Sequence, residues 1–175
     1  VGRVDRNKNQ EMMIRAFARI AGDFPEASMV LYGEGEQRER LKGLVKELGL
    51  TGRVSLPGAQ TDIADKIYTG SMFLLASGHE GMPNALIEAM CLGLPCISTD
   101  CPCGGPAELI RDGENGFLIP VGDEEALAER MRLLLADPER AERMGRQAAG
   151  LLEDYRPEKV NADWTRYLLS RCRSR

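Results

Sequence analysis

A glycine-containing turn with acidic neighbours, at residues 77–84 (Ser-Gly-His-Glu-Gly-Met-Pro-Asn), holds residue types that could do chemistry. It joins the most apolar predicted strand to a predicted helix, and free backbone N–H groups at a helix start favour an anion. Gly81 permits a close backbone approach, and Asn84 supplies a side-chain donor or caps the helix. Glu80 and Glu88 flank the turn, where carboxylates are unfavourable beside an anion unless they hydrogen-bond hydroxyls, such as those of a sugar or ribose.

Each of these carboxylates also has a plainer interpretation. Glu88 fits a solvated helix residue, and Glu80 fits a helix-start charge that interacts with the helix dipole.

Two cations near the start of the chain could bind the phosphates of such a ligand. Arg3 stands at a predicted strand end and Lys8 just before a predicted helix, a spacing that lets both converge above a sheet. A diphosphate suits that arrangement, because each charge-assisted hydrogen bond contributes about 1.5–3 kcal/mol. Ordinary surface charge is the alternative interpretation of both residues.

Alternating strand and helix patterns through residue 122 would position these groups. Short apolar strands are predicted at about 1–3, 28–32, 53–56, 72–76, 95–98 and 116–119. Helices are predicted between them, at about 13–21, 41–48, 62–68, 83–92 and 107–110. This order predicts an α/β fold with a doubly wound parallel sheet, in which ligands bind beyond the carboxyl ends of the strands.

After residue 122 only helical patterns follow, so we predict one domain over 1–175 with a helical extension over about 123–175. The last apolar stripe is Val160, Trp164, Tyr167 and Leu168. We expect the stripes of this extension to pack on the sheet; the alternative is that the last helix docks on a missing domain. The first strand is shorter than the others, which we interpret as truncation of a longer protein.

The charge balance restricts the partners. With 23 basic and 27 acidic residues the net charge is −4, which argues against a general nucleic-acid binder. The one basic cluster lies in the tail: Arg166, Arg171, Arg173 and Arg175. It fits a solvated helix end or, alternatively, peripheral contact with an anionic membrane surface.

The five cysteines include no C-x-x-C pair, and His79 is the only histidine. A zinc site normally shows tighter ligand pairs, so we predict no metal and expect reduced, mostly buried thiols. The odd count suits a reducing cytoplasm.

The turn and its surroundings resemble a known family. The run from Glu80 to Met90 is similar to the E-x7-E motif of the retaining glycosyltransferase family 4, of GT-B architecture. Val1-Gly-Arg3 followed by Lys8 resembles that family's V-G-R…K segment, and Gly33-Glu-Gly35 resembles its G-x-G loop. Residues 104–110 and 113–121 resemble its downstream pattern. The resemblance extends from residue 1 to about 150 and implies a Rossmann-like domain, one half of GT-B.

The resemblance implies a role for each matching residue. The implied donor-binding residues are Arg3, Lys8, Gly33, Gly81, Asn84 and Glu88. Arg3 and Lys8 would hold the donor diphosphate, and Glu88 the ribose hydroxyls. Glu80 would contact the transferred sugar and is the one catalytic assignment. Gly81 and Asn84 would lie along the phosphates and sugar, while Gly33 and the loop at 58–60 would shape the nucleoside pocket.

The family also implies the reaction. A hexosyl or N-acetylhexosaminyl group would pass with retention from a nucleotide diphosphate sugar, foremost a UDP-sugar, to a glycan or lipid-linked acceptor in polysaccharide or glycan synthesis. No cofactor is expected, and because no Asp-x-Asp pair is present, cations and a helix start would neutralise the diphosphate instead of a metal. The expected location is cytoplasmic, with contact at the inner face of the membrane.

The resemblance also implies an amino-terminal acceptor domain, which we expect to lie outside this sequence. The acceptor would bind an amino-terminal domain, so the chain alone should bind the donor and transfer nothing. The Pro83-Asn84 pair resembles members that transfer N-acetylhexosamines in surface-polysaccharide synthesis, whereas Cys101-Pro-Cys103 departs from the small polar residues common there.

Three other functions share features with this sequence. A nicotinamide dehydrogenase is disfavoured, because Arg38 occupies the third glycine position of G-x-G-x-x-G. A GT-B epimerase or phosphorylase would use the same architecture for different chemistry. A non-catalytic module that binds or senses sugar nucleotides is the third.

Overall fold

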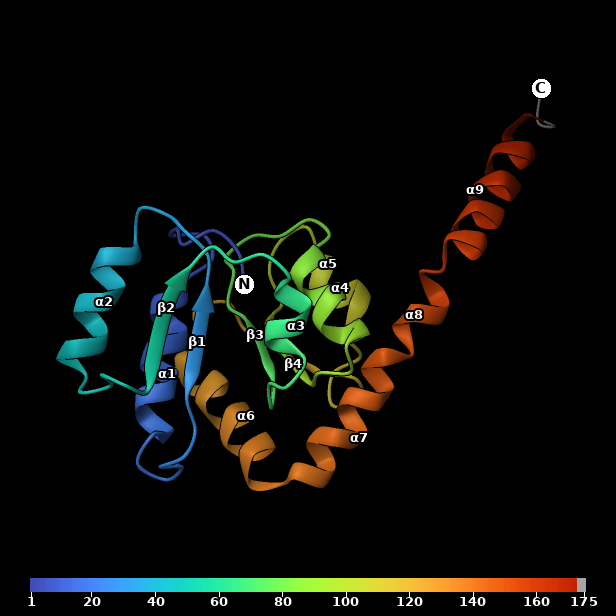
Figure 1. The fold of residues 1–175 in the computed structure, drawn as a ribbon. Coiled ribbons are helices and arrows are strands. Elements are labelled where there is room, and N and C mark those ends of the chain that lie inside the picture. Colours follow the sequence, from blue (N-terminus) through green and yellow to red (C-terminus); the bar gives the residue numbers. More distant parts are fainter. Residues whose placement is uncertain (173–175) are drawn as a thin grey trace.

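The computed structural model describes residues 1–172, without the side chains of residues 152 and 154 (Figure 1). Its strands are β1 (Met29–Tyr32), β2 (Val54–Gly58), β3 (Phe73–Leu75), β4 (Cys96–Thr99) and β5 (Phe117–Ile119). The helices between them are α1 (Gln10–Ile20), α2 (Arg38–Glu47), α3 (Ile63–Ile67), α4 (Asn84–Cys91) and α5 (Gly105–Leu109). The chain ends with α6 (Glu124–Ala136), α7 (Pro138–Ala149), α8 (Leu151–Asp154) and α9 (Pro157–Cys172). The predicted alternation and helical extension are confirmed.

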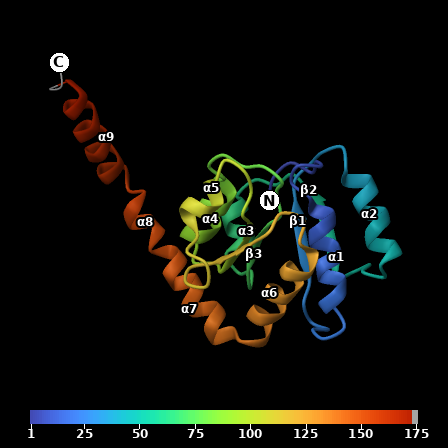
Figure 2. The same ribbon diagram turned by 180° about the vertical axis from the view of Figure 1, so that it is seen from behind.

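All strand pairing is parallel within the described residues, as the intervening helices require. β1 pairs with β2, while β3, β4 and β5 form a second group in that order. α1 and α6 lie side by side on one face (Figure 2), and their apolar stripes meet β1 and β5 in the main core. α4 packs against α7 in a smaller core that includes Leu86, Met90 and Ala148.

The predicted strand at residues 1–3 is wrong as an assigned strand. This segment makes two parallel hydrogen bonds with residues at and after the end of β1: Gly2 N–H to Tyr32 O (3.0 Å) and Val4 N–H to Glu34 O (2.8 Å). Two bonds at one end of β1 are too few to extend the ladder.

A hollow of about 410 Å³ lies between β1 and β3, where the two groups of strands are separated. It is lined by Val1, by residues of β1 and β3 such as Tyr32 and Leu74, and by residues of α1 and α6. Burial and, to a smaller extent, the nearby Lys8 ammonium group together lower the pKa of the Val1 α-amino group to about 6. The predicted single sheet is therefore present as two parallel parts with an unfilled space between them.

The last helix differs from the other carboxyl-terminal helices. α6 contributes Leu127 and Met131 to the core, as predicted, and α7 contributes Met144, but α9 buries no residue. It projects from the body as an arm (Figure 1), with Trp164 60% exposed. The expectation that the last stripe packs on the sheet is wrong, because α8 leads the chain away from the body.

The basic tail is only partly described. Arg166 pairs with Asp163 at 3.0 Å, and Arg171 lies 5.3 Å from the centre of the Tyr167 ring. Arg173 and Arg175 lie outside the described residues. No helix in the described part of the chain combines the length and apolar character that crossing a membrane requires.

Candidate functional site

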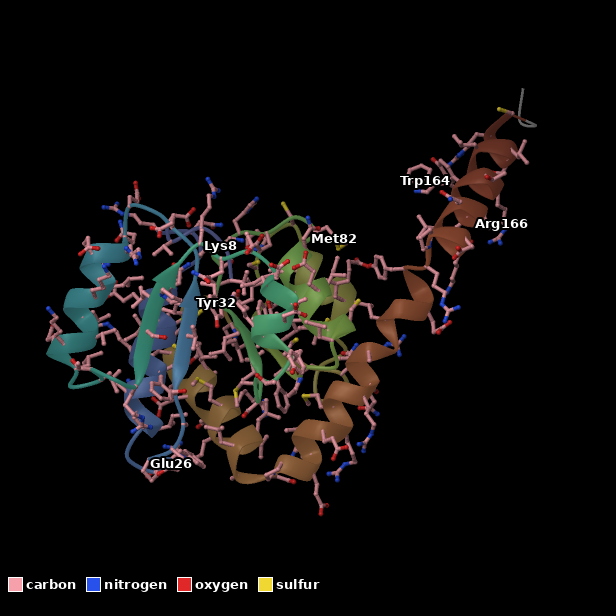
Figure 3. All side chains as sticks on the ribbon, in the orientation of Figure 1. Lys8, Glu26, Tyr32, Met82, Trp164 and Arg166 are labelled. Atoms are coloured by element: carbon pink, nitrogen blue, oxygen red, sulfur yellow. The ribbon has the colours of Figure 1, made fainter. Side chains whose placement is uncertain are left out.

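The turn at 77–84 connects β3 to α4, so it lies at the carboxyl end of a parallel strand as predicted. Figure 3 shows Lys8 and Met82 at this edge of the molecule and Glu26 at the opposite edge. The loop at residues 5–9, the turn and the loop at 101–105 each connect elements at the same edge, and ligands in such folds bind at that edge.

Lys8 and Glu80 form an ion pair that joins two of these loops. The ammonium group donates a hydrogen bond to Oε1 of Glu80, and the two side chains are 21% and 11% exposed. The Lys8 backbone N–H donates to Asp5 Oδ1 (2.9 Å), which fixes the loop that carries it. An ammonium group has three N–H donors, so this pairing leaves donors available for a second anion.

Asn7 fastens the same turn through two further hydrogen bonds. Its side-chain Nδ2 donates to the carbonyl oxygen of His79 (3.0 Å), and its own carbonyl accepts from the Gly78 N–H (2.8 Å). Sequence reasoning missed this residue, because its partners are more than 70 positions away and nothing in its neighbourhood indicates them.

The loop at 101–105 holds the turn from another side. The carbonyl of Pro102 accepts from the Glu80 N–H (3.4 Å), and Cys103 Sγ lies 3.3 Å from Nε2 of His79. A Cβ at Gly105 would lie 1.5 Å from the Gly81 carbonyl oxygen, so only glycine permits this approach. The close approach predicted at Gly81 therefore depends on Gly105; a Cβ at Gly81 itself would meet nothing within 4 Å.

The helix side of the turn is open. α4 begins at Asn84 after Pro83, and no side chain caps it, so Asn84 does not act as the cap. Its first N–H groups have no acceptor within the helix, as at every helix start. Glu88 is exposed and makes no ion pair or side-chain hydrogen bond with the described residues. Asn84 and Glu88 are four residues apart and so share one helix face.

Arg3 does not join Lys8 in this structure. Its side chain is 82% exposed, and its Nε lies 3.4 Å from Asp5 Oδ2. Of the two predicted cations, the structure brings Lys8 to the turn and shows Arg3 paired with a neighbour in the chain.

Gly33 brings the predicted nucleoside loops together. It adopts φ 141°, and a Cβ there would lie 1.8 Å from the carbonyl oxygen of Gly2. Its N–H donates to the carbonyl of Gly58 (2.9 Å), which begins the loop at 58–60. Gly33 and that loop are therefore neighbours beside the segment that carries Arg3.

The cysteines divide into buried and exposed thiols. Cys96 and Cys101 are buried, Cys91 is partly buried, and Cys103 and Cys172 are exposed, so fewer are buried than expected. Burial raises the pKa of the Cys101 thiol, and the nearby Glu80 carboxylate acts in the same direction. Among the described residues no cluster of three or more His, Cys, Asp or Glu side chains could hold a metal ion.

The chemistry available at this edge follows from these contacts. Lys8 and the uncapped start of α4 favour an anion, while the carboxylates of Glu80 and Glu88 can accept hydrogen bonds from hydroxyls. Glu80 is held in place by the hydrogen bond from Lys8 and by the bond from its own backbone N–H to Pro102. The Glu88 carboxylate, in contrast, has no hydrogen-bond partner among the described residues.

Comparison with known proteins identifies relatives of this architecture. The model of the family "Glycosyl transferases group 1" matches residues 1–150. The lipopolysaccharide core biosynthesis glycosyltransferase LpsE of Rhizobium meliloti is 34% identical over 137 residues, which are 78% of this chain and 38% of LpsE.

A second relative comes from Campylobacter jejuni. The N-acetylgalactosamine-N,N'-diacetylbacillosaminyl-diphospho-undecaprenol 4-alpha-N-acetylgalactosaminyltransferase is 31% identical over 169 residues, 97% of this chain and 45% of the relative. The chain thus spans less than half the length of these curated relatives.

Solved structures match the fold closely. HepE of Anabaena, in complex with UDP-glucose, superposes with a TM-score of 0.85 at 25% identity and covers 97% of this chain and 48% of HepE. The carboxyl-terminal domain of the group 1 glycosyltransferase LpcC of Francisella tularensis superposes with a TM-score of 0.79 at 24% identity, over 89% of this chain and 83% of that domain. The fold is therefore that of a carboxyl-terminal GT-B domain.

Proposed function

Because the chain belongs to the glycosyl transferases group 1 family, we propose that it is the donor-binding half of a retaining glycosyltransferase. Its donor is a nucleotide diphosphate sugar, foremost a UDP-sugar. The group transferred is a hexosyl or N-acetylhexosaminyl unit, and the product belongs to polysaccharide or glycan synthesis.

One observation carries this proposal: the Lys8–Glu80 pair stands beside the uncapped start of α4. The remaining N–H donors of Lys8 and the helix start would bind the diphosphate, with Arg3 turning from Asp5 to join them. Glu80, with its carboxylate already fixed, would accept a hydrogen bond from the transferred sugar and is the proposed catalytic residue.

The remaining roles follow the open face of α4 and the loops beside it. Glu88 would accept hydrogen bonds from the ribose hydroxyls, and Asn84 and Gly81 would lie along the phosphates and sugar. Gly33 and the loop at 58–60, which lie together, would border the nucleoside.

The relatives support the choice of donor. HepE was solved with UDP-glucose, and the Campylobacter relative is named as an N-acetylgalactosaminyltransferase. An N-acetyl-alpha-D-glucosaminyl L-malate synthase of Bacillus anthracis is 34% identical over 154 residues. Transfer of a hexose or an N-acetylhexosamine is compatible with all three names.

The proposed chemistry needs no metal. Charge develops on the departing diphosphate in the transition state, and fixed cations with a helix start stabilise such charge where a metal would otherwise do so. Removing divalent ions with EDTA should therefore leave nucleotide affinity unchanged.

The rest of the enzyme is also part of the proposal. The acceptor, a glycan or lipid-linked sugar, would bind an amino-terminal domain in the cytoplasm, with the basic tail offering contact to an anionic membrane surface. The chain alone would then bind the donor without transferring sugar. A full-length protein that binds the donor but never transfers sugar would instead be a sensing module, and one that inverts a sugar centre would be an epimerase.

The hollow between β1 and β3 is the place we propose for the rest of the first strand. A β-forming extension ahead of Val1 should fill it and raise the unfolding temperature. A Gly-Ser extension of equal length should not raise it, and equal effects of both extensions would count against this placement.

Calorimetric titration of the chain with UDP, GDP, ADP and their sugars tests the proposed function. UDP ligands should bind most tightly, and Lys8→Ala should weaken binding at least tenfold, about 1.4 kcal/mol. Arg3→Ala should weaken binding too. Arg132→Ala is the matched control, because it also removes an arginine paired with an aspartate, Asp23, but on α6. Unchanged binding in both Lys8→Ala and Arg3→Ala would move the phosphate site elsewhere.

A further inference from the structure

The Cys103–His79 pair is a chemical group at the turn that the proposed donor site does not use. Sγ of Cys103 lies 3.3 Å from Nε2 of His79, within hydrogen-bonding distance for sulfur, and both residues are exposed. A thiol beside an imidazole can pass its proton to the ring and become a thiolate, the form that attacks sulfur electrophiles.

The pair is joined directly to the residues that hold Glu80. His79 precedes Glu80, and the His79 carbonyl accepts from Asn7. Pro102, which precedes Cys103, accepts the Glu80 N–H. A group attached to Cys103 replaces the thiol hydrogen, so it would disrupt the contact between sulfur and imidazole that joins the two loops beside Glu80.

We propose that Cys103 is a modification site that takes small disulfides, and that its modification opens the Glu80 turn and weakens donor binding. In this step the thiol gives its proton to His79 and the thiolate attacks one sulfur of the disulfide. A new S–S bond forms, the old one breaks, and the departing thiolate takes the proton from His79. The effect on donor binding rests on the proposed function.

The other cysteines supply the comparison that the test needs. Cys96 and Cys101 are buried, and burial raises the pKa of both thiols, so they should react slowly. Cys172 is exposed like Cys103 but lies on α9, far along the arm from the turn (Figure 1). It is a matched accessible thiol without a histidine, since His79 is the only one in the chain.

The experiment uses dithiodipyridine, a small disulfide that releases a coloured pyridinethione for each thiol it modifies. Peptide mapping should find Cys103 modified faster than Cys172. His79→Ala should slow Cys103 to the rate of Cys172 and leave Cys172 unchanged. A Cys103 that reacts no faster than Cys172, with or without His79, would overturn the proposal.

The consequence for the turn is measured on Cys172→Ser, where Cys103 is the only exposed thiol among the described cysteines. Modification should speed hydrogen exchange of residues 78–82 and weaken UDP binding at least tenfold, and reduction should restore both. In Cys103→Ser, where a hydroxyl can still bond His79, the reagent should change neither. Unchanged exchange in the modified Cys172→Ser protein would also overturn the proposal.

The outcomes separate this proposal from the proposed function. If the unmodified chain does not bind UDP, the proposed function fails. The thiol kinetics and the hydrogen exchange at 78–82 would still decide whether Cys103 is a reactive site that controls the turn.

Discussion

The turn at 77–84 and the arm formed by α9 are held in opposite ways. The turn is joined to loops 5–9 and 101–105 by Asn7, Lys8, Pro102 and Cys103, whose partners lie 20 or more positions away in sequence. α9 is well formed as a helix but buries no residue. The comparison shows that Lys8 and Glu80 are fixed by a contact between distant segments, whereas contacts in the arm such as Arg166–Asp163 and Trp164–Tyr167 join residues three positions apart.

Gly105→Ala is the substitution that should destabilise the turn most. The new Cβ would meet the Gly81 carbonyl oxygen at 1.5 Å, and because that atom is backbone, the loops must move apart. We expect a loss of about 3 kcal/mol in the free energy of unfolding and weaker UDP binding. Urea denaturation measures the first and calorimetry the second.

Gly22→Ala is the matched control for that substitution. A Cβ at Gly22 would meet nothing within 4 Å, and its backbone is not in the left-handed region. Its free energy of unfolding should change by less than about 0.5 kcal/mol. Equal stability of the two variants would show that the loops do not touch as described.

Removing the Lys8 ammonium should have the next largest effect. Lys8→Met leaves the Glu80 carboxylate, only 11% exposed, without its cation and should cost about 2 kcal/mol of stability. In the double variant with Glu80→Gln the costs should not add, because the substitutions share one interaction. Urea denaturation of all four proteins gives the coupling energy, and simple additivity would contradict a direct pair.

The sequence predicted the parallel α/β fold and two of the residues that meet at the turn, Lys8 and Glu80. Short apolar strands separated by helices can form few arrangements other than a parallel sheet. Because the carboxyl ends of parallel strands lie at one edge, Lys8 and Glu80 were predicted to lie at that edge. Asn7, Gly105 and the Cys103–His79 contact were missed, since their partners are set by tertiary packing. The position of α9 was wrong for a related reason: an apolar stripe predicts burial but not the surface that provides it.

Asn7→Ala should weaken the turn by a smaller amount. It removes the hydrogen bond to the His79 carbonyl but keeps the backbone bond to Gly78, so about 1 kcal/mol of stability should be lost. Hydrogen exchange should quicken at residues 78–80, with little change in β4 or β5. Asn161→Ala, on the exposed face of α9, is the control, and similar losses in the two variants would remove Asn7 from the set of contacts that hold the turn.

The smallest effect is expected in the arm. Trp164 is the only tryptophan in the chain, is 60% exposed and makes an edge-to-face contact with Tyr167 at 6.1 Å between ring centres. Figure 3 shows it on the arm, away from the body. Trp164→Ala should change the free energy of unfolding by less than about 0.5 kcal/mol.

The same tryptophan reports where the arm lies. Its emission should have the wavelength of a water-exposed indole, be fully quenched by acrylamide, and stay unchanged when UDP is added, because the described part of the arm projects away from the turn (Figure 1). A blue-shifted emission that acrylamide cannot quench would mean that α9 folds back onto a surface. The apolar stripe would then be covered by this chain or a second copy. The contrast between the turn, which contacts two other loops, and the exposed arm would disappear.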